Sequence, residues 1–324
     1  MKIALVGAGV IARVHVKALA ALGMQPAAVC DIDIARAEAL LREFSLDIPV
    51  FTDYGKLLAD VAPDAVHICT PHHCHADMVV AALQKNVHVL CEKPLCIKES
   101  DIPRILAAEK ASRATLGVCH QNRYNPANLF VKEHLQGKQI RAAHGTVAWH
   151  RDAAYYEAGA WRGKWETEGG GVMINQALHT LDLCQWLLGD PETVTATVSN
   201  LSLDGVIEVE DTAAATFKGK NPFTFFATNA SAVSMPVSVV IRTVGEEIVL
   251  LPHSVMINGE AVLHEPQNMV MGKACYGNGH IALLADFYRS VQEGKPFGIN
   301  GTEAAKVIRL ILAMYKSAGK EIAL

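Results

Sequence analysis

The stretch "ICTPHHCHADM" at residues 68–78 places His72, His73, Cys74 and His75 side by side. Imidazole and thiolate groups are zinc ligands, but zinc sites usually space their ligands by two to four residues and take a second pair from elsewhere. Neighbouring side chains on a strand or helix also point apart. We therefore predict no metal site here and look for another role for His75.

A lysine ends the apolar run "HVLCEKPL" as part of Glu92-Lys93-Pro94. A lysine at the end of a buried strand can donate a hydrogen bond to a substrate hydroxyl and stabilise the alkoxide that forms as hydride leaves. The ordinary alternative is a solvated surface lysine. The position at a strand end favours the chemical role.

The segment "GGGVMINQALHTLDLCQWLLGD" at residues 169–190 predicts a helix entered through glycines. Asn175, His179 and Asp182 are spaced i, i+4 and i+7, which puts them on one helix face. Oxidation of a secondary alcohol needs a base, and imidazole exchanges protons near neutral pH, so His179 is the candidate. The alternative for His179 is a structural histidine. Asp182 is either a partner of His179 or a helix-surface carboxylate.

Removal of a hydride from an alcohol needs a cofactor that accepts it, and a glycine-rich turn near the N-terminus is the candidate for binding one. The apolar run "KIALVGAG" is followed by a helical pattern, and residues 7–12 read G-x-G-x-x-A. Gly7 permits a tight turn, Gly9 lets the backbone approach a pyrophosphate, and the helix N-terminus attracts the phosphates. Asp31 ends the second strand, where its carboxylate can accept hydrogen bonds from the ribose hydroxyls and would repel a 2′-phosphate. The sequence therefore predicts NAD rather than NADP. Arg36 is the nearby residue that could accommodate that phosphate.

Alternating strand and helix patterns predict an α/β Rossmann domain, with a doubly wound parallel sheet, over residues 1–121. Helices are expected at about 34–44 and 75–84. The strand "AVHICT" lies beyond the point where strand order reverses, so Thr70 and Pro71 face the cofactor crevice and His75 stands at a helix N-terminus beside it. Residues 122–324 predict an α+β domain with a largely antiparallel open sheet.

Composition excludes several classes of function. The chain has 324 residues and a net charge of −4, with no basic stripe for nucleic acid. It contains no run of eighteen apolar residues for a membrane span and no signal-peptide pattern at its start. Its eight cysteines are scattered, which predicts reduced, buried thiols. These observations predict a cytoplasmic protein with a small-molecule substrate.

The motifs together resemble the glucose–fructose oxidoreductase, inositol dehydrogenase and MocA-like family of NAD(P)-dependent oxidoreductases. The matching parts are G-x-G-x-x-A, Thr70-Pro71 with His75, Glu92-Lys93-Pro94, residues 169–190, and "GH…DFYRSVQEGKP" at 279–296. The resemblance implies an NAD-dependent sugar or cyclitol dehydrogenase. It also implies a catalytic set of Lys93, Asn175 and His179, and a Lys-Pro bond that is often cis.

The same resemblance nominates the ligand contacts. A Trp-Arg pair contacts the cofactor in some members, which selects Trp161 and Arg162 from the aromatic loop 151–171, where Tyr156 is a candidate for a sugar ring. The expected cofactor contacts are Gly7, Gly9, Val10, Ile11, Asp31, Thr70, Pro71, His75, Glu92, Lys93, Asn122, Trp161 and Arg162. The expected substrate contacts are Lys93, Tyr156, Asn175 and His179.

Asn175 departs from the pattern of inositol dehydrogenase-like members, which have aspartate there, so inositol specificity does not transfer directly. An amide cannot take a proton, and we expect Asn175 to orient the substrate or His179. Two alternatives to a dehydrogenase stay open: a glycoside-cleaving enzyme that works by transient oxidation, and an NAD-sensing regulator without catalysis. Family members often pair through the second-domain sheet, which implies a homodimer or homotetramer.

Overall fold

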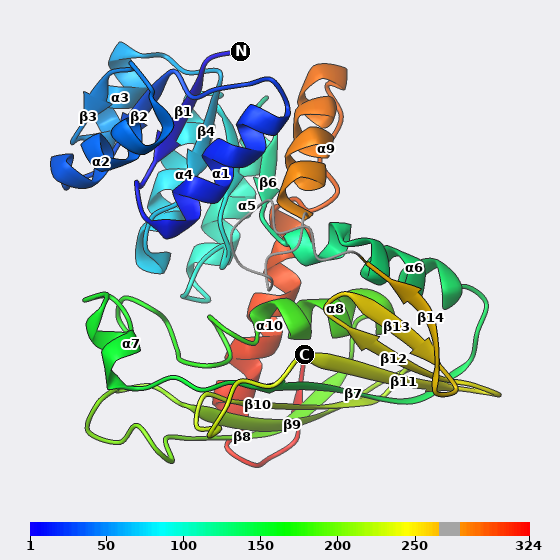
Figure 1. The fold of residues 1–324 in the computed structure, drawn as a ribbon. Coiled ribbons are helices and arrows are strands. Elements are labelled where there is room, and N and C mark those ends of the chain that lie inside the picture. The colour runs from blue at the N-terminus through cyan, green and yellow to red at the C-terminus, as the bar shows by residue number, and fades with distance from the viewer. Residues whose placement is uncertain (266–278) are drawn as a thin grey trace. The chain divides into compact units, whose positions relative to one another are not determined.

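The computed structural model describes residues 1–265 and 279–324 of the chain (Figure 1). The described residues divide into two compact units, the first made of residues 1–121 and 279–305 and the second of residues 122–265 and 306–324. No helix among the described residues combines the length and apolar character that a membrane crossing needs.

The first unit is built on a six-stranded parallel sheet in the order β3-β2-β1-β4-β5-β6. Strand order reverses between β1 and β4, as predicted for the strand that leads to Thr70. The elements are β1 (Ile3–Val6), α1 (Val10–Ala21), β2 (Ala28–Cys30), α2 (Ile34–Phe44), β3 (Val50–Phe51), α3 (Tyr54–Asp60), β4 (Ala65–Ile68), the 3-10 turn η1 (His72–Cys74), α4 (His75–Gln84), β5 (His88–Cys91), α5 (Asp101–Ala111) and β6 (Leu116–Val118). The predicted Rossmann fold and the helices at 34–44 and 75–84 are confirmed.

Residues 279–305 belong to the first unit, so assigning all residues after 121 to the second domain was wrong. Helix α9 (Gly279–Glu293) lies against α1. The hydroxyl of Tyr288 is 2.6 Å from Nε2 of His67 in β4. Gly117 of β6 makes room for Phe287, because an added Cβ would lie 2.8 Å from that ring. The apolar side of α9 therefore finds its partners in the first unit, which the sequence pattern alone does not reveal.

The second unit is built on a nine-stranded sheet in the order β14-β13-β12-β11-β7-β10-β9-β8-β15. All neighbours are antiparallel except β7 and β10, which agrees with the predicted largely antiparallel sheet. The remaining elements are η2 (Gln121–Tyr124), α6 (Pro126–His134), β7 (Ile140–Ala148), α7 (Ala153–Glu157), α8 (Leu178–Leu188), β8 (Thr193–Ser199), β9 (Thr212–Lys218), β10 (Phe223–Thr228), β11 (Ser238–Thr243), β12 (Glu247–Leu251), β13 (Ser254–Ile257), β14 (Glu260–His264), α10 (Gly301–Ser317) and β15 (Ile322–Ala323).

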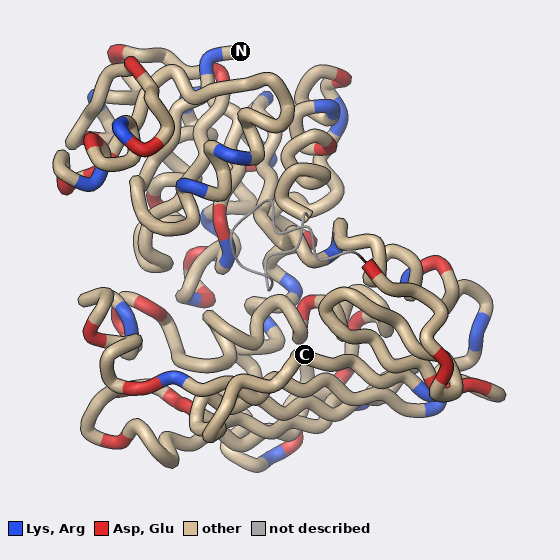
Figure 2. The backbone as a smooth tube through the Cα atoms, viewed as in Figure 1, with Lys and Arg blue, Asp and Glu red and all other residues tan. Residues whose placement is uncertain are grey.

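One face of this sheet packs on helices and the other faces away from them. Helices α6 and α8 contact strands of the sheet on one side (Figure 1). Along β9 and β10, buried residues such as Phe217 alternate with exposed ones such as Thr216, Thr224 and Phe226, as expected for a half-buried strand. Strands β8, β9 and β10 contain a single charged residue, Lys218, and Figure 2 shows how little charge lies along them. The part of the outer face that these three strands form is therefore polar through threonine and carries little charge.

The turn after β1 tolerates no side chain at Gly7. Gly7 has φ of +91°, and an added Cβ would lie 2.6 Å from the carbonyl oxygen of Cys69. Gly23 has φ of +70° but open space around an added Cβ. A Gly23→Ala change should therefore cost only the backbone strain of a positive φ, about 1–2 kcal/mol.

We expect Gly7→Ala to cost more than Gly23→Ala by roughly 1–3 kcal/mol, because overpacking adds to the strain. Equilibrium denaturation in urea measures both losses in free energy of unfolding. Equal losses for the two variants would show that the close approach of Gly7 to Cys69 is relieved at no cost.

Candidate active site

The N-terminus of α1 is open to an anion. Gly9 is its N-cap residue, and an added Cβ there would meet no atom within 4 Å. The first turn has no side-chain cap and no acidic residue, so its backbone N–H groups and dipole stay available to phosphate. Val10 is 61% exposed at the first position of α1, whereas Ile11 is half-buried against the core. The turn therefore fits a pyrophosphate in space and in charge.

Asp31 links the glycine turn to the end of β2. Its Oδ2 accepts a hydrogen bond from the backbone N–H of Ala8 at 2.7 Å, and Oδ1 accepts one from Asp33 at 2.9 Å. Each carboxylate oxygen has a second lone pair, so the group can still accept a ribose hydroxyl. Arg36 instead pairs with Asp33, Nε lying 3.2 Å from Oδ2, on the exposed side of α2.

Sequence reasoning missed Ile32, which follows Asp31 and is 92% exposed. An isoleucine with almost its whole surface in solvent is unusual in a chain that buries most of its aliphatic residues. The available signal was an apolar residue directly after the acidic end of the second strand.

The side chain of His75 contacts two backbone carbonyl groups. His75 is completely buried, with Nδ1 2.6 Å from the carbonyl oxygen of Pro94 and Nε2 2.8 Å from that of Thr70. Both ring nitrogens thus lie at hydrogen-bond distance from a backbone carbonyl oxygen, and a cofactor contact by His75 stays a prediction. His72 is buried and His73 exposed, so the neighbouring histidines do not converge on one point. Thr70 and Pro71 are half-buried.

Lys93 is the accessible member of its segment. Among residues 89–97 it alone is not buried, and its bond to Pro94 is cis, as the resemblance implied. Glu92 is 5% exposed, and its Oε2 accepts the backbone N–H of Lys93 at 3.2 Å. The carboxylate of Glu92 therefore faces the core and holds the turn that carries Lys93, and the cofactor contact of Glu92 stays a prediction.

The core partners of Glu92 are histidines that the sequence did not bring together. His15 Nε2 lies 3.0 Å and His280 Nε2 3.5 Å from Glu92 Oε1. Burial alone would raise the pKa of Glu92, but the hydrogen bonds and charges of these two imidazoles outweigh it and hold the pKa well below its usual range. His15 also contacts His67, with 2.9 Å between the two Nδ1 atoms.

One group of His, Cys and acidic side chains in the described ranges is close enough to hold a metal ion: His15, Glu92 and Cys119, with donor atoms within 4.8 Å of one another. The 3.0 Å separation of His15 and Glu92 is a hydrogen-bond distance. The imidazoles and the thiol surround the carboxylate oxygen, which is the arrangement of a hydrogen-bonded carboxylate. We keep the prediction of no metal.

In the second unit, Asn175 and His179 stand out by exposure. Among residues 168–185 they are the two that are not buried. Helix α8 begins only at Leu178, so Asn175 lies in the turns that precede it and the predicted shared helix face was wrong. The backbone N–H of Ala177 donates a hydrogen bond to the carbonyl oxygen of Val172, five residues earlier. The backbone before α8 is therefore not a regular α-helix, and the i, i+4 spacing does not set the directions of its side chains.

Asn175 contacts a buried carboxyl group that sequence reasoning overlooked. Its Nδ2 donates to Oε1 of Glu168 at 2.6 Å, and the backbone N–H of Gly163 donates to Oε2 at 2.5 Å. Glu168 is completely buried, and burial raises its pKa to about 7 although these donors and the charge of Arg162 lower it. The available signal in the sequence was an acidic residue close to the glycines. Glu166 also fits that signal but is exposed, so the signal alone does not select Glu168.

A second buried glutamate clamps the glycine segment. Glu210 accepts hydrogen bonds from the N–H groups of Gly171 at 2.8 Å and Met173 at 3.0 Å, and from the Tyr315 hydroxyl at 2.9 Å. An added Cβ at Gly171 would lie 1.8 Å from the carbonyl oxygen of Glu210, and one at Gly170 would lie 2.0 Å from the Tyr315 hydroxyl. The glycines thus allow the backbone to reach the carboxylate.

Asp182 is not a helix-surface carboxylate. It is 1% exposed, and Arg123 donates to it twice, from Nε at 2.8 Å and from an Nη at 2.7 Å. Asn122, next to Arg123 in η2, is half-buried, and its carbonyl oxygen accepts a hydrogen bond from Asn128 at 2.5 Å.

Tyr156 of the aromatic loop lies in a small hydrophobic cluster of the second unit. Tyr156 is 5% exposed, packs with Leu203, Ile207 and Val209, and accepts a hydrogen bond from Asn229 at 2.9 Å. Burial leaves Tyr156 little surface for a ligand, and its substrate contact stays an untested prediction.

Arg162 and Trp161 differ from Tyr156 in keeping some exposed surface. Both are half-buried. The guanidinium of Arg162 lies 4.4 Å from the ring centroid of Tyr155 and 5.4 Å from that of Trp161. Their proposed cofactor contact stays a prediction.

Comparison with known proteins identifies both units. Residues 1–120 match the family model described as "Oxidoreductase family, NAD-binding Rossmann fold". Residues 135–249 match the GFO/IDH/MocA C-terminal domain. The two matches follow one another along the chain and together cover most of it.

Individual relatives are more distant. Inositol 2-dehydrogenase of Salmonella typhimurium is 28% identical over 193 residues, which are 59% of this chain and 55% of that protein, so the match spans about half of the relative. D-glucoside 3-dehydrogenase of Escherichia coli is 25% identical over 342 residues, covering 98% of this chain and 95% of the relative.

A solved structure extends the similarity over the whole chain. The WlbA dehydrogenase of Bordetella pertussis, in complex with NADH and UDP-GlcNAcA, is 27% identical, with a TM-score of 0.88 over 100% of this chain and 97% of that one. The matches to both domain models show that the chain belongs to the oxidoreductase family of glucose–fructose oxidoreductase, inositol dehydrogenase and MocA.

Proposed function

We propose that this protein is an NAD-dependent dehydrogenase that moves a hydride between nicotinamide and a secondary alcohol carbon of a sugar, cyclitol or sugar derivative. The observation that carries the proposal is a pattern of exposure. In residues 89–97 only Lys93 is accessible, and in residues 168–185 only Asn175 and His179 are. Side chains suited to proton transfer and alkoxide stabilisation are thus the ones left open in otherwise buried segments.

In the proposed reaction, NAD supplies the hydride acceptor. His179 takes the proton of the substrate hydroxyl as general base, since loss of hydride and loss of this proton are coupled. Lys93 donates a hydrogen bond to the oxygen that gains negative charge. Asn175 orients the substrate or His179 by hydrogen bonding, because its amide cannot carry the proton.

The cofactor proposal rests on the first unit. Gly9 and the N-terminus of α1 would take the pyrophosphate, and Asp31 would accept ribose hydroxyls. We add Ile32 to the predicted contacts, since its exposed side chain next to Asp31 suits the apolar face of an adenine ring. Carboxylate repulsion of a 2′-phosphate favours NAD.

The substrate is proposed only by class. The relatives are named for inositol and D-glucosides, and the WlbA dehydrogenase was solved with UDP-GlcNAcA. A screen of cyclitols, sugars, glycosides and nucleotide-linked sugar acids with NAD and NADP tests the proposal through absorbance at the NADH wavelength. Measuring aglycone release in the same wells separates a dehydrogenase from a glycoside-cleaving enzyme. Cofactor binding with neither reaction on any of these substrates would favour an NAD-sensing regulator.

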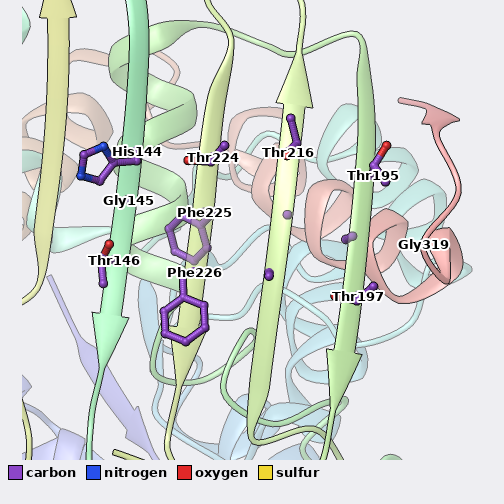
Figure 3. Close-up of a pocket in the computed structure, with 13 residues that line it drawn as sticks. His144, Gly145, Thr146, Thr195, Thr197, Thr216, Thr224, Phe225, Phe226 and Gly319 are labelled. Atoms are coloured by element: carbon purple, nitrogen blue, oxygen red, sulfur yellow. The ribbon is translucent and has the colours of Figure 1, made fainter.

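We also propose that a second copy of the chain covers the outer face of the sheet in the second unit. A pocket on this face is lined by His144, Thr146, Thr216, Thr224 and Phe226, among others (Figure 3). Phe226 is 41% exposed, and strands β8, β9 and β10 carry few charges that burial would have to desolvate. Sedimentation velocity should give a dimer or tetramer that Phe226→Asp dissociates. A native protein that sediments as a monomer at micromolar concentration would contradict this proposal.

The buried thiols of Cys69, Cys91 and Cys119 support a reducing compartment, and we propose that the protein works in the cytoplasm.

Cofactor preference is testable at Asp31. NAD should bind more tightly than NADP, and Asp31→Asn should narrow the difference by about tenfold or more, because a charge-assisted hydrogen bond and the repulsion of the 2′-phosphate are both lost. Arg36→Ala serves as the control and should leave the preference for NAD intact, since Arg36 pairs with Asp33. Fluorescence titration of both cofactors measures the ratio. Tighter binding of NADP by the native protein would overturn the assignment.

The catalytic assignment predicts large losses of turnover with cofactor binding retained. His179→Ala should lower kcat by about 10²–10⁴-fold, as expected for a lost general base. Lys93→Ala should lower it by roughly 10²–10³-fold, as expected for a lost donor to an oxyanion. If both act on one hydroxyl, the double variant should lose less than the product of the single losses.

Exposed Lys98 and His264 provide matched controls, whose alanine variants should keep native kcat. Near-native activity of His179→Ala on the best substrate would remove the proposed mechanism. NAD binding by each variant, measured by titration, separates a lost chemical step from a lost cofactor.

A further inference from the structure

Glu168 is the buried ionisable group in contact with Asn175. Its two carboxylate oxygens accept hydrogen bonds from Asn175 Nδ2 at 2.6 Å and from the backbone N–H of Gly163 at 2.5 Å. The side chain is completely buried, so solvent does not screen this contact. Asn175 itself is half-buried, which places it between the buried carboxyl group and the accessible surface of its segment.

The contact determines which end of the Asn175 amide faces inward. A carboxylate accepts hydrogen bonds and donates none, so only the NH₂ end of the amide can face an ionised Glu168. The amide oxygen is then directed away from Glu168, as an acceptor. A protonated Glu168 has a donor of its own, and both orientations of the amide become possible. The ionisation of Glu168 therefore controls the polarity of Asn175.

The charged and ionisable groups that act on Glu168 come from several elements. They are Arg162 of the aromatic loop, Glu210 before β9, Tyr315 of α10 and Tyr156 of α7. Burial and the like charge of Glu210 raise the pKa of Glu168 and the charge of Arg162 lowers it, leaving it at about 7. Glu168 thus changes its charge within the physiological range of pH.

We propose that Glu168 is a positioning residue of the active site: it acts through Asn175, presenting the amide oxygen to the substrate hydroxyl or to His179 when its carboxyl group is ionised. The proposal rests on the proposed dehydrogenase function and names a group that controls it. It assigns no proton transfer to Glu168.

The decisive experiment follows the side-chain amide of Asn175 by NMR in the full-length protein. In the native protein its ¹H and ¹⁵N shifts should move with a midpoint near pH 7, in the range of the raised pKa of Glu168. Glu168→Gln should abolish this titration. This readout needs no substrate, so it tests the inference even if the dehydrogenase assignment fails.

Two glutamates provide matched controls. Glu210 is also buried, with a pKa raised by burial to about 7, but its hydrogen bonds go to Gly171, Met173 and Tyr315. Glu166 is exposed two residues before Glu168. Glu210→Gln and Glu166→Gln should both leave the Asn175 titration in place. An Asn175 amide that does not titrate in the native protein, or titrates unchanged in Glu168→Gln, overturns the proposal.

Kinetics supply the second arm once a substrate is found. Glu168→Gln should lower kcat by roughly 10–100-fold, the scale of a hydrogen bond to a charged group, with KM changed much less. It should also remove the part of the fall in kcat near pH 7 that comes from protonation of Glu168, and leave the part that comes from protonation of the general base. Glu168→Asp keeps the charge and should restore this pH dependence in part, whereas a purely structural role would give similar losses and an unchanged pH profile in Glu168→Gln and Glu210→Gln.

Discussion

The turn that carries Lys93 is held by a hydrogen bond from its own backbone N–H to the carboxylate of Glu92. The same interaction recurs at the dinucleotide turn, where Ala8 donates to Asp31, and at the glycine segment that Glu210 holds. Carboxylates are strong acceptors for backbone N–H groups, and these bonds are stronger than neutral ones. An acidic side chain therefore accepts backbone N–H groups at each of these three turns and holds the backbone there in place.

Burial disfavours the ionised form of a carboxyl group, and the buried glutamates of the two units respond to it differently. Glu92 sits against the imidazoles of His15 and His280, whose hydrogen bonds and charges lower its pKa despite burial. Glu168 and Glu210 are held mainly by uncharged donors, and burial raises the pKa of each to about 7. The carboxylate in the first unit thus stays ionised. In the second unit, burial outweighs the hydrogen bonds that Glu168 and Glu210 accept, so both carboxyl groups change their charge near pH 7.

Linkage gives these raised pKa values a consequence for stability. A carboxyl group with a folded-state pKa above its unfolded value favours folding most at low pH, and this contribution is lost as pH rises through about 7. Glu168 and Glu210 therefore oppose folding in the pH range where the proposed function needs Glu168 ionised. Such a conflict is common where a site requires a buried charge.

The sequence by itself determined the alternating strands and helices, the dinucleotide turn and the Glu-Lys-Pro and glycine-helix motifs. These depend on apolar periodicity and on glycine and proline at fixed spacing, which are local properties. It also selected Lys93, Asn175 and His179, which the structure leaves accessible in buried segments.

Tertiary structure decided the partners and the burial of the remaining site candidates. His15 meets Glu92 across 77 positions and Tyr315 meets Glu210 across 105, and no local pattern specifies such pairs. The same holds for Tyr156, a plausible sugar contact in sequence that the fold buries. Glu168 lies only seven positions from Asn175, yet an irregular turn rather than a regular helix joins them. Contacts made through irregular backbone and long-range packing depend on how the whole chain fills space, and periodicity carries no record of that.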